Sequence, residues 1–341
     1  MPIEQLKHAG NFLALSRLDP DVFSTPIDFK LSNGTLVAIS SPGIISFTPG
    51  KTHGRDLLFS CGVHGNETAP IEICDELVRA LLTEEIESCQ RVLFLFANLP
   101  AMDIAERFVE ENMNRLFSGA HSQGEGLCNA ERVRAKELED AVGAFFSASD
   151  DNAEKIHYDL HTAIRASKNE KFAVYPYLNG KPRNKEQLAL LSACGVNTIL
   201  LSESPTTTFS YYSTHMFDVH GFTVELGQVR PFGQNDMQKF AAVKNTLQRL
   251  IVEVQPIFPA FDETQMEIYR VNQVINKHHD DFELHFADDI PNFMDFDQGQ
   301  ILATETGATY KSEQNGEAIV FPNAHVALGQ RALLTVVPTK I

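Results

Sequence analysis

The sequence predicts an α/β fold with a mostly parallel sheet, followed by a smaller β-rich domain. From about residue 57 onward, short apolar runs typical of buried strands alternate with helical segments, which is the pattern of a parallel sheet with connecting helices. After Pro256 and Pro259 the apolar runs are β-like and are separated by Gly, Asn and Asp. We therefore expect one domain at residues 1–256 and a β-rich domain at residues 257–341.

The first elements follow from apolar spacing and turn residues. LLFSC at 57–61 predicts a strand. The segment 70–82 predicts a helix, because its apolar residues recur at helical spacing and Pro70 suits the first helical position. RVLFLFA at 91–97 predicts the next strand, and the NLP turn after it leads into AMDIAERFV.

The same alternation continues to the end of the first domain. Helical patterns predict helices at 129–147, 185–194 and 235–254. Apolar runs predict strands at 156–160, 172–178, 197–203 and 221–227. In the second domain, strands are expected in MEIYRVNQVI, FELHF, EAIVFP and RALLTVV.

Composition argues against several classes of protein. The 341 residues carry a formal net charge of −17 without a basic run, which argues against nucleic acid and anionic membranes as partners. No apolar stretch approaches the ~20 residues of a membrane span, and MPIEQLKHAGNF lacks the apolar core of a signal peptide. Five cysteines without a CxxC pair favour reduced thiols. We therefore expect a cytoplasmic enzyme that acts on a small molecule, with a homo-oligomer as a further possibility.

The turn CGVHGNETAP at 61–70 offers two metal ligands. His64 and Glu67 leave the carboxyl end of a strand, where open α/β sheets bind their ligands. A catalytic zinc commonly takes three protein ligands from His, Glu or Asp, so these residues would supply two of them. A polar turn that caps the following helix explains the short HxxE pattern equally well.

A third ligand has to come from another strand end. KIHYDLHTAIR offers His157 and His161. We prefer His161, the last residue before a turn, because its position matches that of His64, whereas His157 lies deeper and is expected to be packed and hydrogen-bonded. Asp159 either orients an imidazole or is an ordinary strand carboxylate with satisfied hydrogen bonds.

A general base is expected in GFTVELG, where Glu225 interrupts an apolar run. A charged residue in a central strand is costly unless it has a task or a partner. Burial would raise its pKa toward neutral pH, which suits a group that takes a proton from water. The alternative is a buried salt bridge.

The stretch RFVEENMNRLF at 107–117 carries candidate substrate groups. Arginines such as Arg107 and Arg115 bind carboxylates through two parallel hydrogen bonds, and an arginine can also stabilise an oxyanion. Asn114 adjoins Arg115. Without a metal site nearby, these residues would more often be surface groups paired with the glutamates at 106, 110 and 111.

Six motifs occur in an order that resembles a known family. They are HGNE at 64–67, NLPA at 98–101, Arg107, NR at 114–115, DLHT at 159–162 and VELG at 224–227. Together they resemble the aspartoacylase and succinylglutamate desuccinylase family, a branch of the zinc carboxypeptidase-like hydrolases, over about residues 55–232. The resemblance implies a zinc-carboxypeptidase-like α/β/α domain, with the C-terminal β-rich domain covering the cleft.

The resemblance also implies roles for these residues. One zinc ion per subunit would be held by His64, Glu67 and His161, and Glu225 would promote attack by water. Arg107 would stabilise the oxyanion, whereas Asn114 and Arg115 would bind the α-carboxylate. The implied reaction is hydrolysis of N-succinyl-L-glutamate to succinate and L-glutamate, the last step of arginine catabolism by the succinyltransferase route.

One departure concerns the distal carboxylates of the substrate. The aspartoacylase branch has a substrate-binding arginine roughly ten residues before the base, where this sequence has His215. Arg230, in QVRPFG, is a substitute candidate, with a plain surface charge as the alternative. The family also uses a tyrosine of the C-terminal domain, for which Tyr310 in ETGATYK is the best match.

Three other functions remain open from the sequence. A peptide carboxypeptidase or an aspartoacylase-type deacylase would use the same chemistry on another substrate. A zinc-containing protein that only binds acyl amino acids would need no base, so Glu225 argues against it. A nucleotide-dependent enzyme is disfavoured, because no GxGxxG or P-loop pattern follows a strand.

Overall fold

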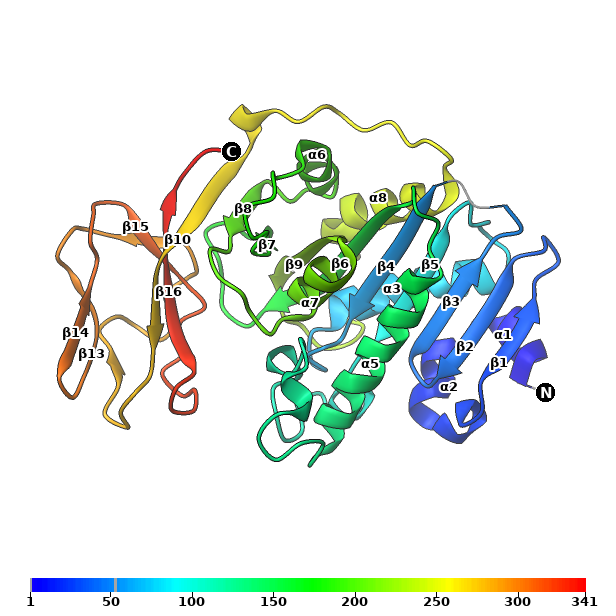
Figure 1. The fold of residues 1–341 in the computed structure, drawn as a ribbon, viewed down its shortest axis with the longest axis horizontal. Helices are drawn as coiled ribbons and strands as arrows, with labels where there is room; N and C mark the ends of the chain where they lie inside the picture. The colour runs from blue at the N-terminus through cyan, green and yellow to red at the C-terminus, as the bar shows by residue number, and fades with distance from the viewer. Residues whose placement is uncertain (1, 52–53) are drawn as a thin grey trace.

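A long twisted sheet crosses the whole molecule in the computed structural model, which describes residues 2–51 and 54–341 (Figure 1). Among these residues the sheet has 13 strands. In spatial order they are β1 (Ile27–Lys30), β2 (Leu36–Ser41), β3 (Ile44–Thr48), β5 (Arg91–Phe96), β4 (Arg55–Cys61), β6 (Glu154–Ala163), β9 (His220–Gln228), β7 (Phe172–Tyr175), β8 (Thr198–Leu201), β10 (Glu267–Asn276), β16 (Arg331–Pro338), β15 (Glu317–Val320) and β12 (Met294–Phe296). A smaller sheet consists of β11 (Glu283–Leu284), β13 (Ile301–Glu305) and β14 (Ala308–Lys311).

The helices connect the strands of the first three quarters of the chain. They are α1 (Pro2–Ala9), α2 (Phe12–Leu18), α3 (Thr68–Leu82), α4 (Leu99–Asp103), α5 (Ala130–Ser147), α6 (Lys185–Ala193), α7 (Phe209–Phe217) and α8 (Ala241–Val252). Short 3-10 turns are η1 (Pro20–Phe23), η2 (Met113–Arg115), η3 (Ala120–Ser122), η4 (Met237–Phe240) and η5 (Glu263–Gln265). Within the described ranges, none of the helices has both the length and the apolarity to cross a membrane.

The centre of the sheet is parallel, as the sequence predicts. β5, β4, β6 and β9 run side by side in one direction, and β7 then pairs with β9 in the opposite direction. Their apolar runs are buried on both faces. Because parallel strands end at one edge, the turns that follow β4, β6 and β9 meet there. This confirms the predicted α/β class with a mostly parallel sheet.

Alternate residues of the central strands supply two separate cores. Leu57 and Phe59 of β4 join α1, α2, α3, α6 and α8 on one face of the sheet. Leu58, between them, packs on the other face with α5 and α7. This alternation follows from the two-residue period of a strand. It produces the expected helix–sheet–helix layers.

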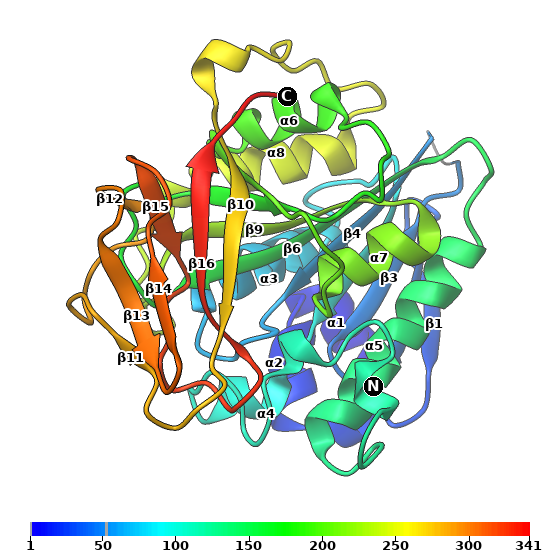
Figure 2. The same ribbon diagram turned by 60° about the vertical axis from the view of Figure 1, so that its left-hand side comes forward.

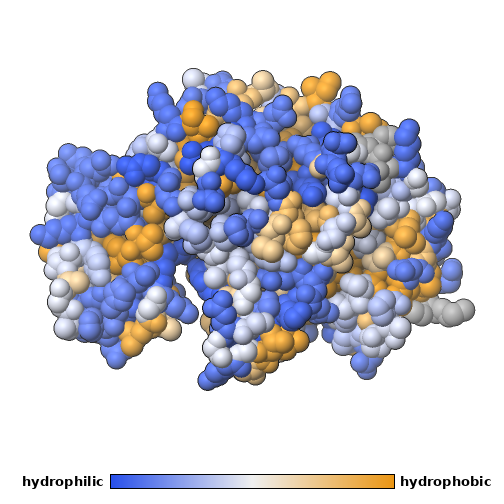
Figure 3. All heavy atoms as spheres, viewed as in Figure 1, coloured by the Kyte–Doolittle hydropathy of each residue, from blue (hydrophilic) through white to orange (hydrophobic). Residues whose placement is uncertain are grey.

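The C-terminal strands extend the same sheet instead of forming a separate layer. Residues 267–270 of β10 pair in parallel with β8, and residues 269–276 pair in the antiparallel sense with β16, which lies beside β10 in Figure 2. A cluster that includes Phe172, Leu200 and Leu334 packs across this junction. The predicted boundary at Pro256 lies in the segment between α8 and β10. In the space-filling view, a notch separates the lower end of these strands from the rest of the molecule (Figure 3).

Three features differ from the expected elements. No element was expected before residue 57, where α1, α2 and β1–β3 form, and α7 was not expected either. The sequence of α7, FSYYSTHMF, is rich in aromatic and hydroxyl residues of low helical propensity, so its packing against β9 and β6 favours the helix. The strand β6 runs past His161 to Ala163, which pairs with Gln228 after a register shift.

Candidate active site

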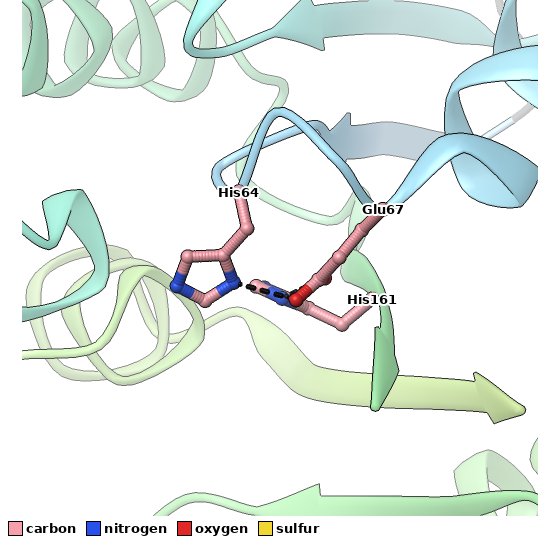
Figure 4. Close-up of side chains that lie close together, drawn as sticks. All are labelled: His64, Glu67 and His161. Carbon is pink, nitrogen blue, oxygen red and sulfur yellow. Dashed lines mark hydrogen bonds and ion pairs between the residues drawn. The ribbon is translucent and has the colours of Figure 1, made fainter. Parts of the chain in front are cut away.

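Three predicted ligands converge at the carboxyl edge of the sheet. His64 follows β4, Glu67 precedes α3, and His161 lies near the end of β6 (Figure 4). Their potential ligand atoms all lie within 4.8 Å of one another, and all three side chains are buried. Nδ1 of His64 is 2.9 Å from Oε1 of Glu67, and Nδ1 of His161 is 2.9 Å from Oε2. The structure therefore brings the predicted trio together.

The outer nitrogens of both imidazoles are held by oxygens. Nε2 of His64 lies 3.0 Å from Oδ1 of Asn112, and Nε2 of His161 lies 3.0 Å from Oδ2 of Asp159. In the neutral tautomers that donate through Nε2, both Nδ1 atoms would offer a lone pair to a metal ion. The buried Nδ1 of His64 makes no hydrogen bond of good geometry within the described residues, although Oε1 of Glu67 lies 2.9 Å away. Two imidazoles and one carboxylate around an unpartnered buried nitrogen fit a zinc ion with one position left open.

The helix-capping alternative for Glu67 does not hold. Glu67 occupies the N-cap position of α3, but its side chain makes no capping hydrogen bond. Instead its carboxylate accepts from the backbone N–H of Thr162 at 3.1 Å and from Nη1 of Arg107 at 2.8 Å. The carboxylate is therefore directed into the site.

A buried chain of hydrogen bonds fixes His161 from behind. The hydroxyl of Ser60 donates to Oδ1 of Asp159 at 2.6 Å and lies 2.8 Å from Nε2 of His157. Nδ1 of His157 lies 2.7 Å from the hydroxyl of Ser213. Burial lowers the pKa of His157 to about 4, so its imidazole is neutral at pH 7. His157 is thus the packed, hydrogen-bonded residue that the sequence predicts, and Asp159 orients an imidazole.

Gly65 allows the ligand turn to lie against α4. A Cβ atom at this position would be 2.2 Å from the backbone carbonyl carbon of Ala101 and 2.3 Å from the nitrogen of Met102. The Gly65 N–H donates to the carbonyl of Arg107 at 3.2 Å. The turn that carries His64 and Glu67 is therefore held by backbone contacts that leave no space for a side chain.

The charges of the metal-ligand residues favour the binding of a cation. Burial would raise the pKa of Glu67, but His64 and His161 outweigh it and hold this pKa well below the usual range. Burial would lower the pKa of His161, but Asp159 and Glu67 outweigh it and raise this pKa well above the usual range. Burial and the charge of Arg107 lower the pKa of His64 to about 4. Two buried carboxylates thus remain ionised beside a neutral His64.

Glu225 lies next to the ligands on the neighbouring strand. It pairs with His161 in the register of β6 and β9, and its side chain is 7% exposed. Burial raises the pKa of its carboxyl to about 7, and the charge of Glu67 adds to this against the opposing charges of His161 and Arg107. Its Oε2 has no hydrogen-bond partner, and no ion pair of Glu225 is found within residues 2–51 and 54–341. A buried salt bridge therefore does not explain this residue, and a carboxyl with a pKa near 7 is compatible with proton exchange near neutral pH.

The arginines of the predicted substrate stretch also face the site. Arg107 contacts Glu67, and its side chain is 31% exposed. Arg115 donates to the carbonyl of Asn114 at 3.0 Å, and burial and the nearby charge of Arg107 lower its pKa to about 10. The buried Asn114 accepts from the backbone N–H of Phe209 at 3.3 Å. These contacts differ from the surface pairing with neighbouring glutamates that the sequence left open.

A cleft of about 710 Å³ contains all of these groups. The metal-ligand trio, Glu225, Arg107, Asn114 and Arg115 line it from the sheet. The C-terminal part supplies the opposite wall, with residues that include Val271, Asn292, Phe321, Arg331 and Leu334. The β-rich part thus forms one wall of the cleft.

Three predicted substrate residues do not line this cleft. His215 is exposed on the last turn of α7, where its ring stacks on Tyr211 with centroids 5.4 Å apart. Arg230 is exposed after β9. Tyr310 lies in the smaller sheet and donates to Glu305 at 2.7 Å. The sequence analysis selected these residues by their distance along the chain from Glu225 or by residue type. In the structure, all three lie outside the cleft lining.

Asn112, Arg165 and Arg331 are among the polar cleft residues that the sequence analysis did not single out. Asn112 holds His64 from within the quoted stretch RFVEENMNRLF. Nε of Arg165, just after β6, donates to the carbonyl of Pro322 at 3.1 Å and so joins the two walls. Arg331 begins β16. In the sequence, Arg331 is the arginine that precedes the apolar run ALLTVV. Many surface arginines have the same position at the start of a strand, so the pattern did not mark this residue.

Family models match both parts of the chain. The succinylglutamate desuccinylase/aspartoacylase catalytic domain matches residues 53–251. The AstE/AspA barrel-sandwich hybrid domain matches residues 264–339. The two matches together span most of the 341 residues.

Similar proteins cover nearly the whole chain. The succinylglutamate desuccinylase of Pseudoalteromonas atlantica is 55% identical over 341 residues, which cover 99% of this chain and 97% of that protein. The succinylglutamate desuccinylase of Shewanella woodyi is 50% identical over 336 residues, which cover 98% and 97%. The crystal structure of the succinylglutamate desuccinylase from Chromobacterium violaceum superimposes with a TM-score of 0.86 at 37% identity and covers 98% of this chain and 99% of its own.

The substitution Gly65→Ala should displace the ligand turn. Because the added Cβ would meet backbone atoms of α4 at about 2 Å, His64 and Glu67 have to move, and we expect bound zinc to fall below a tenth of an ion per chain after dialysis. The measurement is the metal content of the purified protein. Gly143→Ala is the control, since its Cβ would meet only Cζ of Phe217, at 3.6 Å. Full zinc content in Gly65→Ala would contradict this account of the turn.

The substitution Asp159→Asn should weaken zinc binding by about 10–100-fold, because it removes the charge that holds Nε2 of His161. Competition with a chelator of known affinity measures the change. Asp56→Asn is the control: this carboxyl is equally buried at the opposite end of β4 and pairs with Arg91 at 2.6 Å. An equal loss of affinity in both variants would point to general destabilisation instead of support for His161.

Proposed function

The chain belongs to the succinylglutamate desuccinylase/aspartoacylase family, and from this premise we propose that it hydrolyses N-succinyl-L-glutamate to succinate and L-glutamate. The observation that carries the proposal is the identity of 55% to a succinylglutamate desuccinylase over nearly the full length of both chains. In this proposal the enzyme is a zinc-dependent amidohydrolase that completes arginine catabolism by the succinyltransferase route.

A zinc ion fits the trio of His64, Glu67 and His161, and when bound it supplies Lewis-acid polarisation of the carbonyl and activation of water near neutral pH. The chain's own residues then perform the proton transfers and bind the substrate. Glu225, whose pKa burial raises to about 7, accepts the proton of the attacking water and returns it to the leaving amine.

The arginines bind the charges of the substrate and of the tetrahedral intermediate. The guanidinium of Arg107 lies at the ligand cluster, where it stabilises the negative charge that develops on the carbonyl oxygen. Arg115 has no carboxylate partner within the described residues, and its fork is free to bind the α-carboxylate of the glutamyl part. Asn114 adjoins it in the cleft wall.

The cytoplasmic location, a possible homo-oligomer and zinc as the bound metal stay predictions. All five cysteines are free thiols in the structure, and Cys61, Cys74 and Cys194 are buried. Buried free thiols are compatible with a reducing compartment.

The first test is an assay of the purified, zinc-loaded protein with N-succinyl-L-glutamate and, in parallel, N-acetyl-L-aspartate. We expect release of glutamate from the succinyl compound only, and loss of this activity with a chelator, because the trio requires an ion for catalysis. Re-addition of zinc should restore the rate. Release from the acetyl compound would indicate an aspartoacylase-type enzyme, and no release from either compound would refute the proposed reaction.

The substitution Glu225→Gln should lower kcat by about 10²–10⁴-fold, because the amide cannot accept the proton of the attacking water. Zinc content and the binding of L-glutamate should be retained, which distinguishes loss of the base from loss of the site. Glu317→Gln is the control, since this glutamate is fully buried in β15 and does not line the cleft. Near wild-type turnover in Glu225→Gln would refute its role as the base.

A further inference from the structure

Arg331 has the features of an unfilled anion-binding residue in the C-terminal wall of the cleft. Its Nε atom is inaccessible to solvent and has no hydrogen-bond partner in the part of the chain that the structure describes. Its guanidinium lies over the ring of Phe321, 5.4 Å from the centroid, and both residues line the cleft. No ion pair of Arg331 is present within residues 2–51 and 54–341. A buried guanidinium donor without a partner is costly, unless a ligand supplies the missing acceptor.

The surroundings of Arg331 repel its charge. Burial and the nearby charge of Arg115 lower the pKa of Arg331 to about 9. Burial and the charge of Arg107 likewise lower the pKa of Arg115, and the three guanidiniums of Arg107, Arg115 and Arg331 line one cleft. Only Arg107 has a carboxylate partner, Glu67. In a chain of net charge −17, such a row of cations is compatible with a ligand that carries several negative charges.

We propose that Arg331 binds the side-chain carboxylate of the glutamyl part of the substrate and thereby selects a dicarboxylic amino acid. This inference rests on the proposed function. Both carboxylates of the glutamyl part lie on the amine side of the scissile bond, whereas the succinyl carboxylate lies on the acyl side. If Arg115 binds the α-carboxylate, Arg331, which lines the same cleft and has no acceptor for its Nε within the described residues, is available for the second carboxylate on the same side.

The competing explanation is structural. Arg331 opens β16 and stacks on Phe321, so it could simply hold the C-terminal strands together. If the role is structural, substitution of Arg331 would lower the stability of the protein or reduce kcat/KM for all substrates by the same factor. A binding role would change only the discrimination between ligands that have and lack the side-chain carboxylate.

The deciding experiment is calorimetric titration of the zinc-loaded protein with L-glutamate and with L-glutamine. We expect the wild-type protein to favour glutamate by about tenfold or more, since a charge-assisted hydrogen bond is lost with the amide. Arg331→Met should remove most of this preference, and Arg331→Lys should retain part of it. Arg270→Met is the control, because Arg270 is exposed on the adjacent strand β10 and does not line the cleft.

Kinetics with three substrates identify which carboxylate is involved. Arg331→Met should equalise kcat/KM for N-succinyl-L-glutamate and N-succinyl-L-glutamine, but it should leave the preference for succinyl over butanoyl on L-glutamate unchanged. Loss of the acyl preference instead, or equal loss on all substrates, would overturn the proposal. If no substrate is hydrolysed, the proposed function fails and the titration still decides the role of Arg331. Absence of any preference for glutamate in the wild-type titration would also overturn it.

Discussion

The parallel pairing of β4, β6 and β9 is the constraint on which the site depends. It brings the turn after β4 beside the end of β6, and it sets Glu225 of β9 opposite His161 in the register. The ligand atoms can then meet without any long side chain reaching across the sheet. The buried chain from Asp159 through Ser60 to His157 lies within the same strands, so the support of the ligand is built into the sheet itself.

Most of the candidate site residues on the central sheet could be predicted, because the end of a strand is recognisable from a short stretch of sequence. An apolar run followed by a polar turn marks His64 and His161, and a glutamate inside an apolar run marks Glu225. The opposite wall could not be predicted in this way. Which residues of a β-rich segment face a cleft depends on strand pairing between β10 and β16, and no local pattern around Arg331 carries that information. His215 failed for a related reason, because counting back from Glu225 assumes a fixed path through α7.

Electrostatics divide the cleft into two regions of opposite character. Around the ligand trio, Glu67 and Asp159 remain ionised and favour a cation. Arg115 and Arg331 also line the cleft, and burial lowers their pKa values. Arg107 lies between the regions and contacts Glu67. A protein of net charge −17 thus brings Arg107, Arg115 and Arg331 into one cleft, where their charges favour an anionic ligand.

The pairing of β8 with β10 has a consequence for biosynthesis. Thr198–Leu201 is a fully buried apolar strand whose outer edge is completed only by residues 267–270. During synthesis this edge stays unpaired until residues 267–270 leave the ribosome. The other edge of β10 stays unpaired until β16 has been synthesised. An unfinished or C-terminally truncated chain therefore presents an open, apolar strand edge, which is a template for aggregation. Quality control of this protein would act on its last strands.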